Sequence, residues 1–334
     1  MARRSLLGHS PAGCFYADYI MRDAQQPNSM TQCEIRTLAQ SYGFADAYCL
    51  RPAPLKDAWA AMCRVQPPHT GGLCLDPASE FPWASSVLLL VRAYRPFKKE
   101  SGLPGYYIAS NAGYHASNAL CAELTARGYR AERLEVPLPA LVTQAGLGTL
   151  CKNAMLDIGD FGTRTALFTL ATDACAPQTN LPSPPPSCGA CNMCANACPV
   201  GAIDPVQGLN AQLCLRAYME SAPMPDWVMQ RLPGLLGCEL CQYACPRNSH
   251  TAPREPSPEE REAFDIEALL RGEQSHARPL VGKNMCGGGR LIAQAAVLAA
   301  HSKKAELLPE LRRLIEHPQP GVRHAAAWAL EKLT

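Results

Sequence analysis

The sequence predicts an α+β fold in consecutive parts, and three observations lead to this expectation. Helical patterns alternate with strand-like segments over residues 31–180, which is typical of helices packed against a sheet. A block rich in cysteine follows over residues 181–250, and residues 251–334 predict a linker and a helical C-terminus. Residues 1–30 show no convincing periodicity and are expected to be an N-terminal extension.

The first part opens with a clear helix signal. Thr31 and Glu34 have the spacing of a capping box, and Gly43 follows the last apolar position as a C-terminal cap. The segment 85–93 is continuously apolar, which predicts a central strand buried on both faces. The other elements expected in this part are strands at 44–49, 129–136 and 161–171 and a helix at 116–127.

Two proline-rich segments, 180–187 and 251–262, separate the parts of the chain. No helix or central strand tolerates such a density of proline, so we expect linkers. Beyond the second linker, helices are expected at 305–317 and 321–333, joined by a turn that resembles a HEAT-repeat turn. A solenoid needs about three repeats, so we interpret this pair as a packing appendage.

Composition excludes several classes of protein. With 47% hydrophobic and 18% charged residues, wholesale disorder is excluded. The formal net charge of +2 lacks the strong basic character of a nucleic-acid-binding domain. No apolar run reaches the ~18 residues of a membrane span. Arg3 and Arg4 could begin an export signal, but the apolar stretch after them ends at Gly8, short of the ~7–15 residues required. We therefore expect a cytoplasmic protein with reduced thiols and no membrane partner.

The cysteine block has the spacing of an iron–sulfur protein. It contains the C-x2-C-x2-C-x3-C-P run of bacterial ferredoxins, whose fourth cysteine ligates the other cluster. A second run, C-x2-C-x3-C-P, and one isolated cysteine supply four further thiolates. We therefore expect two [4Fe–4S] clusters. The first is assigned to Cys188, Cys191, Cys194 and Cys245, and the second to Cys198, Cys214, Cys238 and Cys241.

A pair of zinc sites is the alternative interpretation, because four-cysteine zinc sites also use x2 spacing. Zinc sites rarely combine two x2 steps with a fourth cysteine before proline, so we favour clusters. Clusters indicate electron transfer, and a bare ferredoxin would not need the part before residue 181. The first part is therefore expected to receive the electrons.

The segment 145–153, with the sequence AGLGTLCKN, is the most informative one outside the cysteine block. Two glycines in four residues indicate a tight turn where the backbone can approach another group closely. The segment is neither a phosphate loop nor a dinucleotide fingerprint, because Gly-Lys-Ser/Thr and GxGxxG are both absent.

This segment resembles the Ala-Gly-Leu-Gly-x-x-Gly-Lys/Arg segment of the epoxyqueuosine reductases and the related reductive dehalogenases. The likeness includes the 145–173 block, all eight cluster cysteines and the C-terminal tail, and it covers about 31–334. It implies a nitroreductase-like α/β domain that binds cobalamin, a ferredoxin-like two-[4Fe–4S] module and a short HEAT-like helical segment. It also implies a low-potential electron donor of the ferredoxin or flavodoxin type.

Two departures from the family pattern bear on the chemistry. The family motif Gly-Arg-Asp-Tyr-His carries the aspartate thought to protonate the substrate, but residues 111–115 read NAGYH, so that Gly113 stands in place of the acid. The last glycine of the loop motif is Cys151. A tyrosine could replace the acid if a neighbouring cation lowered its pKa. The catalytic candidates are therefore Lys152, Tyr107 and Tyr114.

Three functions stay open at this point. The chain is expected to be a cobalamin-dependent iron–sulfur reductase of an electrophilic small molecule, an epoxyqueuosine reductase acting on a modified tRNA nucleoside, or a non-catalytic electron-transfer or corrinoid-handling protein. The cofactor-binding residues that the resemblance implies are Gly146, Leu147, Gly148, Cys151, His115 and Arg164. Cysteines without ligand spacing are expected to be small buried hydrophobic side chains; besides Cys151 these are Cys14, Cys33, Cys49, Cys63, Cys74, Cys121, Cys175 and Cys286.

Overall fold

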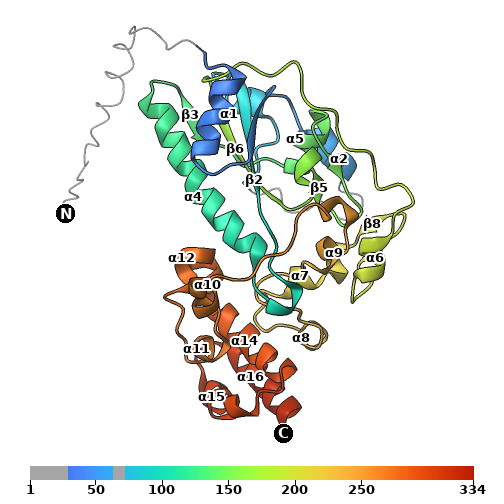
Figure 1. Cartoon of the computed structure of the whole chain (residues 1–334), viewed down its shortest axis with the longest axis vertical. Coiled ribbons are helices and arrows are strands. Elements are labelled where there is room, and N and C mark those ends of the chain that lie inside the picture. Colours follow the sequence, from blue (N-terminus) through green and yellow to red (C-terminus); the bar gives the residue numbers. More distant parts are fainter. Residues whose placement is uncertain (1–28, 63–71) are drawn as a thin grey trace, which may run out of the picture.

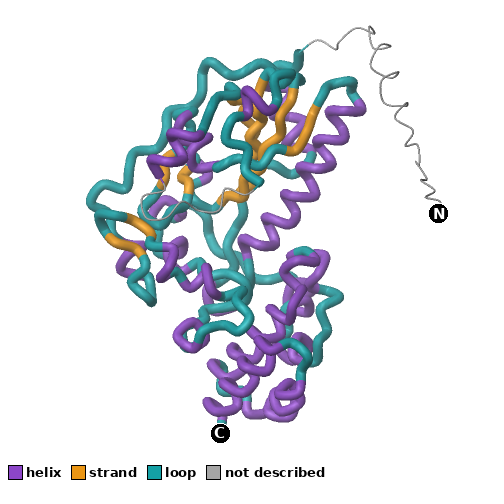
Figure 2. The backbone as a smooth tube through the Cα atoms, turned by 180° about the vertical axis from the view of Figure 1, so that it is seen from behind, coloured by secondary structure: helices purple, strands orange, loops and turns teal. Residues whose placement is uncertain are grey.

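The computed structural model describes residues 29–62 and 72–334. The expected extension at 1–30 lies almost entirely outside the described residues. Figure 1 shows an α/β layer at one end of an elongated molecule, a helical region at the other, and the cysteine-rich segment beside the junction. Figure 2 shows the same separation from behind, with the larger sheet at one end and helices at the other.

The main sheet is antiparallel, with the strand order β1-β2-β6-β3. The central pair, β2 and β6, stays in register from Ser86 opposite Thr172 to Ala93 opposite Thr165. Its four strands are β1 (Asp46–Leu50), β2 (Ser86–Ala93), β3 (Ala131–Arg133) and β6 (Thr165–Thr172).

Helices cover both faces of this sheet, which explains the continuous apolar character of β2. Leu88 and Leu90 pack toward α1 (Gln32–Ser41) and α4 (Gly105–Ala126). Val87, Leu89 and Val91 pack toward the other face, which holds α2 (Lys56–Met62) and α5 (Leu138–Gln144). Each such side chain stabilises the fold by about 1.5–3 kcal/mol when it is fully buried. The short helix α3 (Pro77–Glu80) precedes β2.

The predicted start of the first helix is confirmed. Thr31 accepts a hydrogen bond from the Glu34 N–H, and the Glu34 carboxylate accepts one from the Thr31 N–H, so the capping box is complete. The second helix differs from the prediction, because α4 begins at Gly105 rather than at 116. Two glycines lower the intrinsic helix propensity of its first half. Burial of Tyr107 and Ala109 compensates, and that is a tertiary effect.

Two strands are shorter than predicted. β3 occupies only the middle of the expected strand at 129–136, because Gly128 still belongs to the turn after α4 and Pro137 already caps α5. β6 begins at Thr165 rather than at 161, because a 3₁₀ turn at Gly159–Phe161 and the left-handed Gly162 come first.

The cysteine-rich segment consists of short elements that follow two small hairpin strands of the α/β part. These strands are β4 (Thr149–Leu150) and β5 (Leu156–Asp157). The segment itself contains α6 (Met193–Ala197), β7 (Ile203–Asp204), β8 (Gly208–Leu209), α7 (Leu215–Tyr218), α8 (Asp226–Met229) and α9 (Leu240–Tyr243), with 3₁₀ turns at Ala211–Leu213 and Pro246–Asn248.

The C-terminal region holds more helices than the predicted pair. The expected linker at 251–262 ends in a helix, because Ser257 and Glu260 form a capping box at its start. The helix expected at 305–317 is a central α-helix flanked by two 3₁₀ turns, at Ala305–Leu307 and Leu314–Glu316. The helices are α10 (Pro258–Ala263), α11 (Ile266–Leu270), α12 (Ala277–Val281), α13 (Lys283–Cys286), α14 (Arg290–His301), α15 (Leu308–Arg313) and α16 (Pro320–Leu333).

This region shares one hydrophobic core with the cysteine-rich segment. Val228 and Met229 of α8 are fully buried together with Leu291 of α14 and Val322 of α16. Tyr107 of α4 belongs to the same core. The core therefore crosses the boundary expected at residue 250 and ties the C-terminal helices to both other parts.

Two cysteines contradict the expectation of unpaired thiols. Cys49 at the end of β1 and Cys175 after β6 form a disulfide, with their Cα atoms 6.5 Å apart. The chain brings them together because residues 174–178 run past the start of β2, where the Gln178 N–H donates to the Cys49 carbonyl (2.8 Å). Among the described helices, none has the length and apolarity needed to cross a membrane.

Candidate metal centre

The eight cysteines expected to bind iron lie in two neighbouring groups. One cavity of about 120 Å³ is lined by the first group: Cys188, Cys191, Cys194 and Cys245. In the second group, burial and the neighbouring thiols raise the pKa values of Cys214, Cys238 and Cys241. Cys198 is one of the neighbouring thiols that raise the pKa values of Cys214 and Cys238. The first expected set therefore lines one cavity and the members of the second set lie near one another, while the assignment of each set to a cluster stays a prediction.

Short turns position the thiols of the first run. The Cys191 N–H donates to the Cys188 carbonyl (3.0 Å), which closes the first loop. α6 carries Cys194, and the helix ends at Cys198. The next residue is proline, which has no N–H to continue the helix, so the chain turns away toward the second group.

The two groups suit a cationic occupant. Burial raises the pKa of Cys238 to about 11 and that of Cys241 to about 12, so these thiols stay neutral unless a cation is present. A bound metal reverses this effect, because a coordinating thiol is deprotonated. Within the described residues, no three His, Cys, Asp or Glu side chains are arranged around the position of a single metal ion. Four thiols around one cavity are the donor set of a [4Fe–4S] cluster.

The hairpin β4–β5 reaches the cavity of the first group. Its tip is closed by the Cys151 N–H, which donates to the Met155 carbonyl (2.8 Å), and by the Ala154 N–H, which donates to the Cys151 carbonyl (2.9 Å). Cys151 lines the cavity beside Cys188, and burial together with Cys188 raises the pKa of its thiol. Cys151, expected at a corrinoid, therefore lies among the cluster thiols.

Lys152 holds the loop that carries the first two ligands. Its Nζ donates to the carbonyl oxygens of Gly189 (2.9 Å) and Cys191 (3.0 Å) and to Asn192 Oδ1 (2.9 Å). These acceptors match the three N–H donors of an ammonium group. We expected Lys152 to face a catalytic tyrosine, and the structure instead engages its ammonium in the cluster loop.

Asn153 is a buried amide between the two groups. Its side chain is in the cavity of the first group and the residue is only 2% exposed. The oxygen Oδ1 accepts a hydrogen bond from the Met155 N–H (3.2 Å), which orients Nδ2 away from the hairpin. Nδ2 has no hydrogen-bond partner among the described residues, and the nearby Asn153 side chain opposes the rise in the pKa of Cys241.

Arg164 joins the sheet to the second group of thiols. Its guanidinium forms an ion pair with Glu239 (Nη1 to Oε2, 2.7 Å), and the two side chains are only 2% and 12% exposed. Glu239 lies between Cys238 and Cys241 in the sequence, and its other oxygen accepts a hydrogen bond from the Tyr106 N–H (2.9 Å). Arg164, expected to contact the cofactor, is therefore occupied by a carboxylate of the cluster segment.

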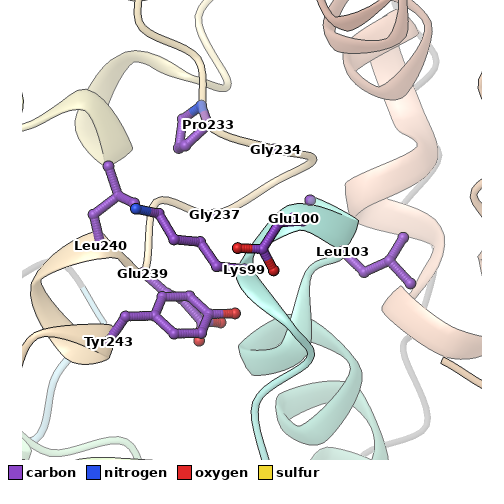
Figure 3. Close-up of a pocket in the computed structure, with 10 residues that line it drawn as sticks. Lys99, Glu100, Leu103, Pro233, Gly234, Gly237, Glu239, Leu240 and Tyr243 are labelled. Atoms are coloured by element: carbon purple, nitrogen blue, oxygen red, sulfur yellow. The ribbon is translucent and has the colours of Figure 1, made fainter. Parts of the chain in front are cut away.

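A cavity of about 340 Å³ opens beside this ion pair. One wall is formed by residues 99–103 and the other by residues 233–243. Figure 3 shows Lys99 extending across the cavity toward Leu240, while Glu239 and Tyr243 come from the opposite segment. A molecule in this cavity would contact the loop that carries Cys238 and Cys241.

A larger cavity of about 530 Å³ lies at the expected cofactor loop. Gly146 lines it with a left-handed backbone (φ 68°), and a Cβ at this position would meet open space. Gln178 lines the same cavity, and its buried Oε1 has no hydrogen-bond partner. Corrinoids carry peripheral amides, which could donate to such an oxygen, so this cavity fits part of the expected cofactor.

The two residues that follow Gly146 serve packing. Leu147 is 1% exposed in the core of the α2/α5 layer. A Cβ on Gly148 would come within 2.7 Å of Val142 Cγ1 and 2.8 Å of the Asp157 carbonyl oxygen. Glycine is thus required at 148 by the close approach of neighbouring backbone.

The candidate tyrosines have different environments on α4. Tyr107 is 8% exposed, and its hydroxyl donates to Glu220 Oε1 (2.8 Å). Tyr114 is 46% exposed, with its ring edge-on to His115 and its face 4.5 Å from the guanidinium carbon of Arg133. His115, a cofactor candidate, is exposed beside it.

Gly113 has no room for a side chain. A Cβ there would lie 2.2 Å from Phe168 Cε2 and 3.1 Å from Arg92 Cδ. Real Cβ atoms do not approach other atoms as closely as 2.2 Å. An acid at this position would therefore require Phe168 to move.

Sequence reasoning missed several polar residues at the centre. Asn153 directly follows the predicted Lys152, and Glu239 is a carboxylate between two ligand cysteines, so both positions carried a local signal. Glu220 and Gln178 carried none, because only the tertiary structure brings them to Tyr107 and to the Gly146 cavity.

Comparison with known proteins shows what this arrangement is similar to. Residues 187–248 match the family model of the 4Fe-4S double cluster binding domain. Over 210 aligned residues the chain is 32% identical to the epoxyqueuosine reductase of Bacillus subtilis (strain 168). The aligned region is 58% of this chain and 52% of that protein. The chain is similar to epoxyqueuosine reductases over this part of its length. It spans about half the length of the curated relatives it matches.

Solved structures of epoxyqueuosine reductases share the fold of this chain. The crystal structure of an epoxyqueuosine reductase with an epoxyqueuosine-modified tRNA stem loop has a TM-score of 0.70 at 24% identity and covers 90% of each chain. A second structure, of the Bacillus subtilis enzyme with an aspartate catalytic loop swung out of its active site, has a TM-score of 0.69 at 24% identity and the same coverage. The predicted mixed α/β fold with a double-cluster domain is confirmed.

Proposed function

We propose that the chain is a cobalamin-dependent iron–sulfur reductase, in which two [4Fe–4S] clusters deliver electrons to cobalt and thence to an electrophilic substrate. One observation carries the proposal. The β4–β5 hairpin belongs to the α/β part, yet its tip lines the cavity of the first thiol group. A cluster bound in that cavity would therefore lie in contact with the α/β part.

The chain's own residues hold the clusters in place. The two cysteine sets assigned above provide four thiolates each, the ligand count of a [4Fe–4S] cluster. Lys152 fixes the first ligand loop through three hydrogen bonds. The Arg164–Glu239 ion pair fixes the second loop against the sheet.

The corrinoid would lie against the α/β part. The backbone of Gly146 and the amide oxygen of Gln178 would contact its edge in the cavity of about 530 Å³. When reduced, a corrinoid cobalt supplies a strong nucleophile and one-electron reductant. The protein's contribution is to hold the ring and to exclude water from it.

Of the two candidate tyrosines on α4, Tyr114 is the more accessible proton source, and it lies on the face of the sheet opposite to α5 and the Gly146 cavity. Tyr114 is 46% exposed, whereas Tyr107 is 8% exposed and its hydroxyl donates to Glu220. The Arg133 guanidinium faces the Tyr114 ring and would stabilise the negative charge left when the proton is transferred. Lys152 acts in this proposal by positioning the cluster loop rather than by contacting substrate.

Cofactor binding tests the proposal directly. Protein purified without oxygen and reconstituted with iron and sulfide should contain about eight irons per chain. Added cobalamin should bind and change its visible spectrum, and the change should be lost in a Gly146→Trp variant that fills the cavity. A Gly272→Trp variant, at an exposed turn with open space around it, is the control. Zinc in place of iron, or no cobalamin binding, would overturn the proposal.

Epoxyqueuosine reduction on tRNA is the second candidate, and the named relatives favour it. The absence of an acid at Gly113, and the contact that Phe168 would make with one, argue against the usual proton route. The test is to incubate reduced holoprotein with tRNA that contains epoxyqueuosine and to measure queuosine by mass spectrometry. Conversion above that of a Tyr114→Phe control would support this substrate. Association with tRNA should also weaken with salt.

A non-catalytic role is the third interpretation. It would be supported if the holoprotein reduced no electrophile but passed electrons to or from a partner protein. The cavity beside the second thiol group, with Lys99 across it, is the surface we propose for the low-potential electron donor. A Lys99→Glu change should then slow reduction by a ferredoxin or flavodoxin but not by dithionite.

A further inference from the structure

The cavity of the first group contains one thiol more than a cluster uses. A [4Fe–4S] cluster takes four cysteine ligands. Five cysteines line this cavity: Cys151, Cys188, Cys191, Cys194 and Cys245. Cys151 is the one outside the ferredoxin spacing, and it stands where the family pattern has glycine.

Cys151 is held next to one particular ligand. The side chains of Cys151 and Cys188 line the same cavity, and Cys188 is the neighbouring thiol that most raises the pKa of Cys151. The following residue, Lys152, donates to the carbonyl of Gly189, the residue that follows Cys188. The hairpin is thus tied through Lys152 to the residue after Cys188, and Cys151 faces the same cavity as Cys188. The hairpin tip is in turn fixed by the hydrogen bond from the Cys151 N–H to Met155.

A second observation indicates that this side of the cavity faces a ligand. Asn153 lines the same cavity, is 2% exposed, and has an Nδ2 without an N or O partner. A buried amide without such a partner is costly unless the cavity holds an acceptor. Cluster sulfur is such an acceptor, so Cys151 and Asn153 approach the same occupant from one hairpin.

We propose that Cys151 is a reserve ligand of the first cluster, able to replace Cys188 on its iron. In the exchange, the bond between iron and the Cys188 sulfur breaks, a bond between iron and the Cys151 sulfur forms, and Cys188 takes the proton that Cys151 releases. The charge and electron count of the cluster do not change. The inference rests on the ligand assignment in the proposed function.

The experiment compares alanine variants of the ligand cysteines after anaerobic reconstitution. We expect Cys188→Ala to retain about eight irons and the electron paramagnetic resonance signals of two reduced [4Fe–4S] clusters, because Cys151 supplies the missing thiolate and releases its proton to solvent. Cys191→Ala, a matched control with no reserve thiol, should lose the first cluster or convert it to a three-iron form. Cys151→Ala should keep both clusters.

The double variant Cys188→Ala with Cys151→Ala should behave like Cys191→Ala. The second cluster reports folding in the same sample, because a chain that lost only the first cluster keeps about four irons. If the double variant keeps no iron, the comparison of the two single variants decides the question. Loss of the first cluster in Cys188→Ala, to the same extent as in Cys191→Ala, would overturn the reserve-ligand proposal. Retention of both clusters in Cys191→Ala, or no clusters in the unaltered chain, would instead overturn the ligand assignment.

Discussion

At the scale of single residues, Asn153 and Gly113 show how one side chain sets local chemistry. The Asn153 amide is buried at the cavity of the first thiol group, with its oxygen accepting a hydrogen bond from the Met155 N–H and its nitrogen without a hydrogen-bond partner among the described residues. Gly113 leaves the space that Phe168 fills, so the acid of the family pattern has been replaced by packing. Asn153 thus supplies a hydrogen-bond donor, whereas Gly113 leaves the site without the acid that the family pattern has there.

The Asn153 amide should raise the reduction potential of the cluster it contacts. An N–H···S hydrogen bond stabilises the more negative, reduced cluster. We expect Asn153→Leu to lower the midpoint potential by roughly 60 mV, a tenfold change for one electron. A potentiometric titration followed by electron paramagnetic resonance measures this. Asn111→Leu, whose amide contacts the Pro279 carbonyl instead, is the control and should leave both potentials unchanged. Equal potentials in the Asn153 variant and the unaltered chain would rule the effect out.

Gly113→Ala should destabilise the protein although alanine favours helices. Alanine gains about 1 kcal/mol over glycine inside a helix. Overpacking against Phe168 should cost about 1–3 kcal/mol and outweigh this gain. The free energy of unfolding in urea measures the difference. In a Phe168→Leu background the same change should be neutral or stabilising, and additive effects of the two changes would contradict the explanation.

At the scale of elements, the contacts between the sheet and the cysteine-rich segment position the centre. The Arg164–Glu239 ion pair connects the residue before β6 to the loop before α9. Gly162 lies so close to the segment that a Cβ would be 2.5 Å from the Arg247 carbonyl oxygen. The β4–β5 hairpin adds Lys152 on the ligand loop. These three contacts hold the thiols against the α/β part.

Breaking the buried ion pair should cost far more than breaking an exposed one. Arg164→Met leaves the Glu239 carboxylate buried without its partner, and we expect a loss of about 3–5 kcal/mol in the free energy of unfolding. Arg127→Met removes an exposed i,i+4 partner of Glu123 and should cost less than about 1 kcal/mol. Adding Glu239→Gln to Arg164→Met should recover much of the loss. Similar costs for Arg164→Met and Arg127→Met would show that the pair is not effectively buried.

At the scale of the whole molecule, the cysteine-rich segment is the connection between the two ends. Its described helices have only four or five residues, and isolated helices shorter than ~12–15 residues are marginal in water. The segment also supplies Val228 and Met229 to the core of the C-terminal helices. Cluster ligation should therefore stabilise more than the ligand loops themselves.

Removal of iron should lower hydrogen-exchange protection in some parts of the molecule and leave it unchanged in others. Because metal binding energy is folding energy in small metal-binding segments, chelation should abolish hydrogen-exchange protection over 188–247. It should also reduce protection in α14, which shares a hydrophobic core with the cysteine-rich segment and whose Gln294 donates to the Met219 carbonyl, while β2 and β6 keep theirs. Mass-spectrometric hydrogen exchange on holoprotein and chelator-treated protein tests this. Uniform loss of protection, or none, would show that the segment folds independently of its metal.

The sequence by itself determined the capping box of α1 and the central strand β2, and it singled out the eight candidate ligand cysteines. Each depends on residues close together in the chain: x2 spacing, a Thr31–Glu34 pair and a continuous apolar run. The order of the sheet, the early start of α4 and the Cys49–Cys175 disulfide were decided by tertiary structure. Tertiary structure also decided the hydrogen bond from Lys152 to the ligand loop and the ion pair between Arg164 and Glu239. The spacing of nearby residues indicates which side chains can bind the same metal group. Contacts between segments far apart in the sequence depend on tertiary packing, which no local sequence pattern encodes.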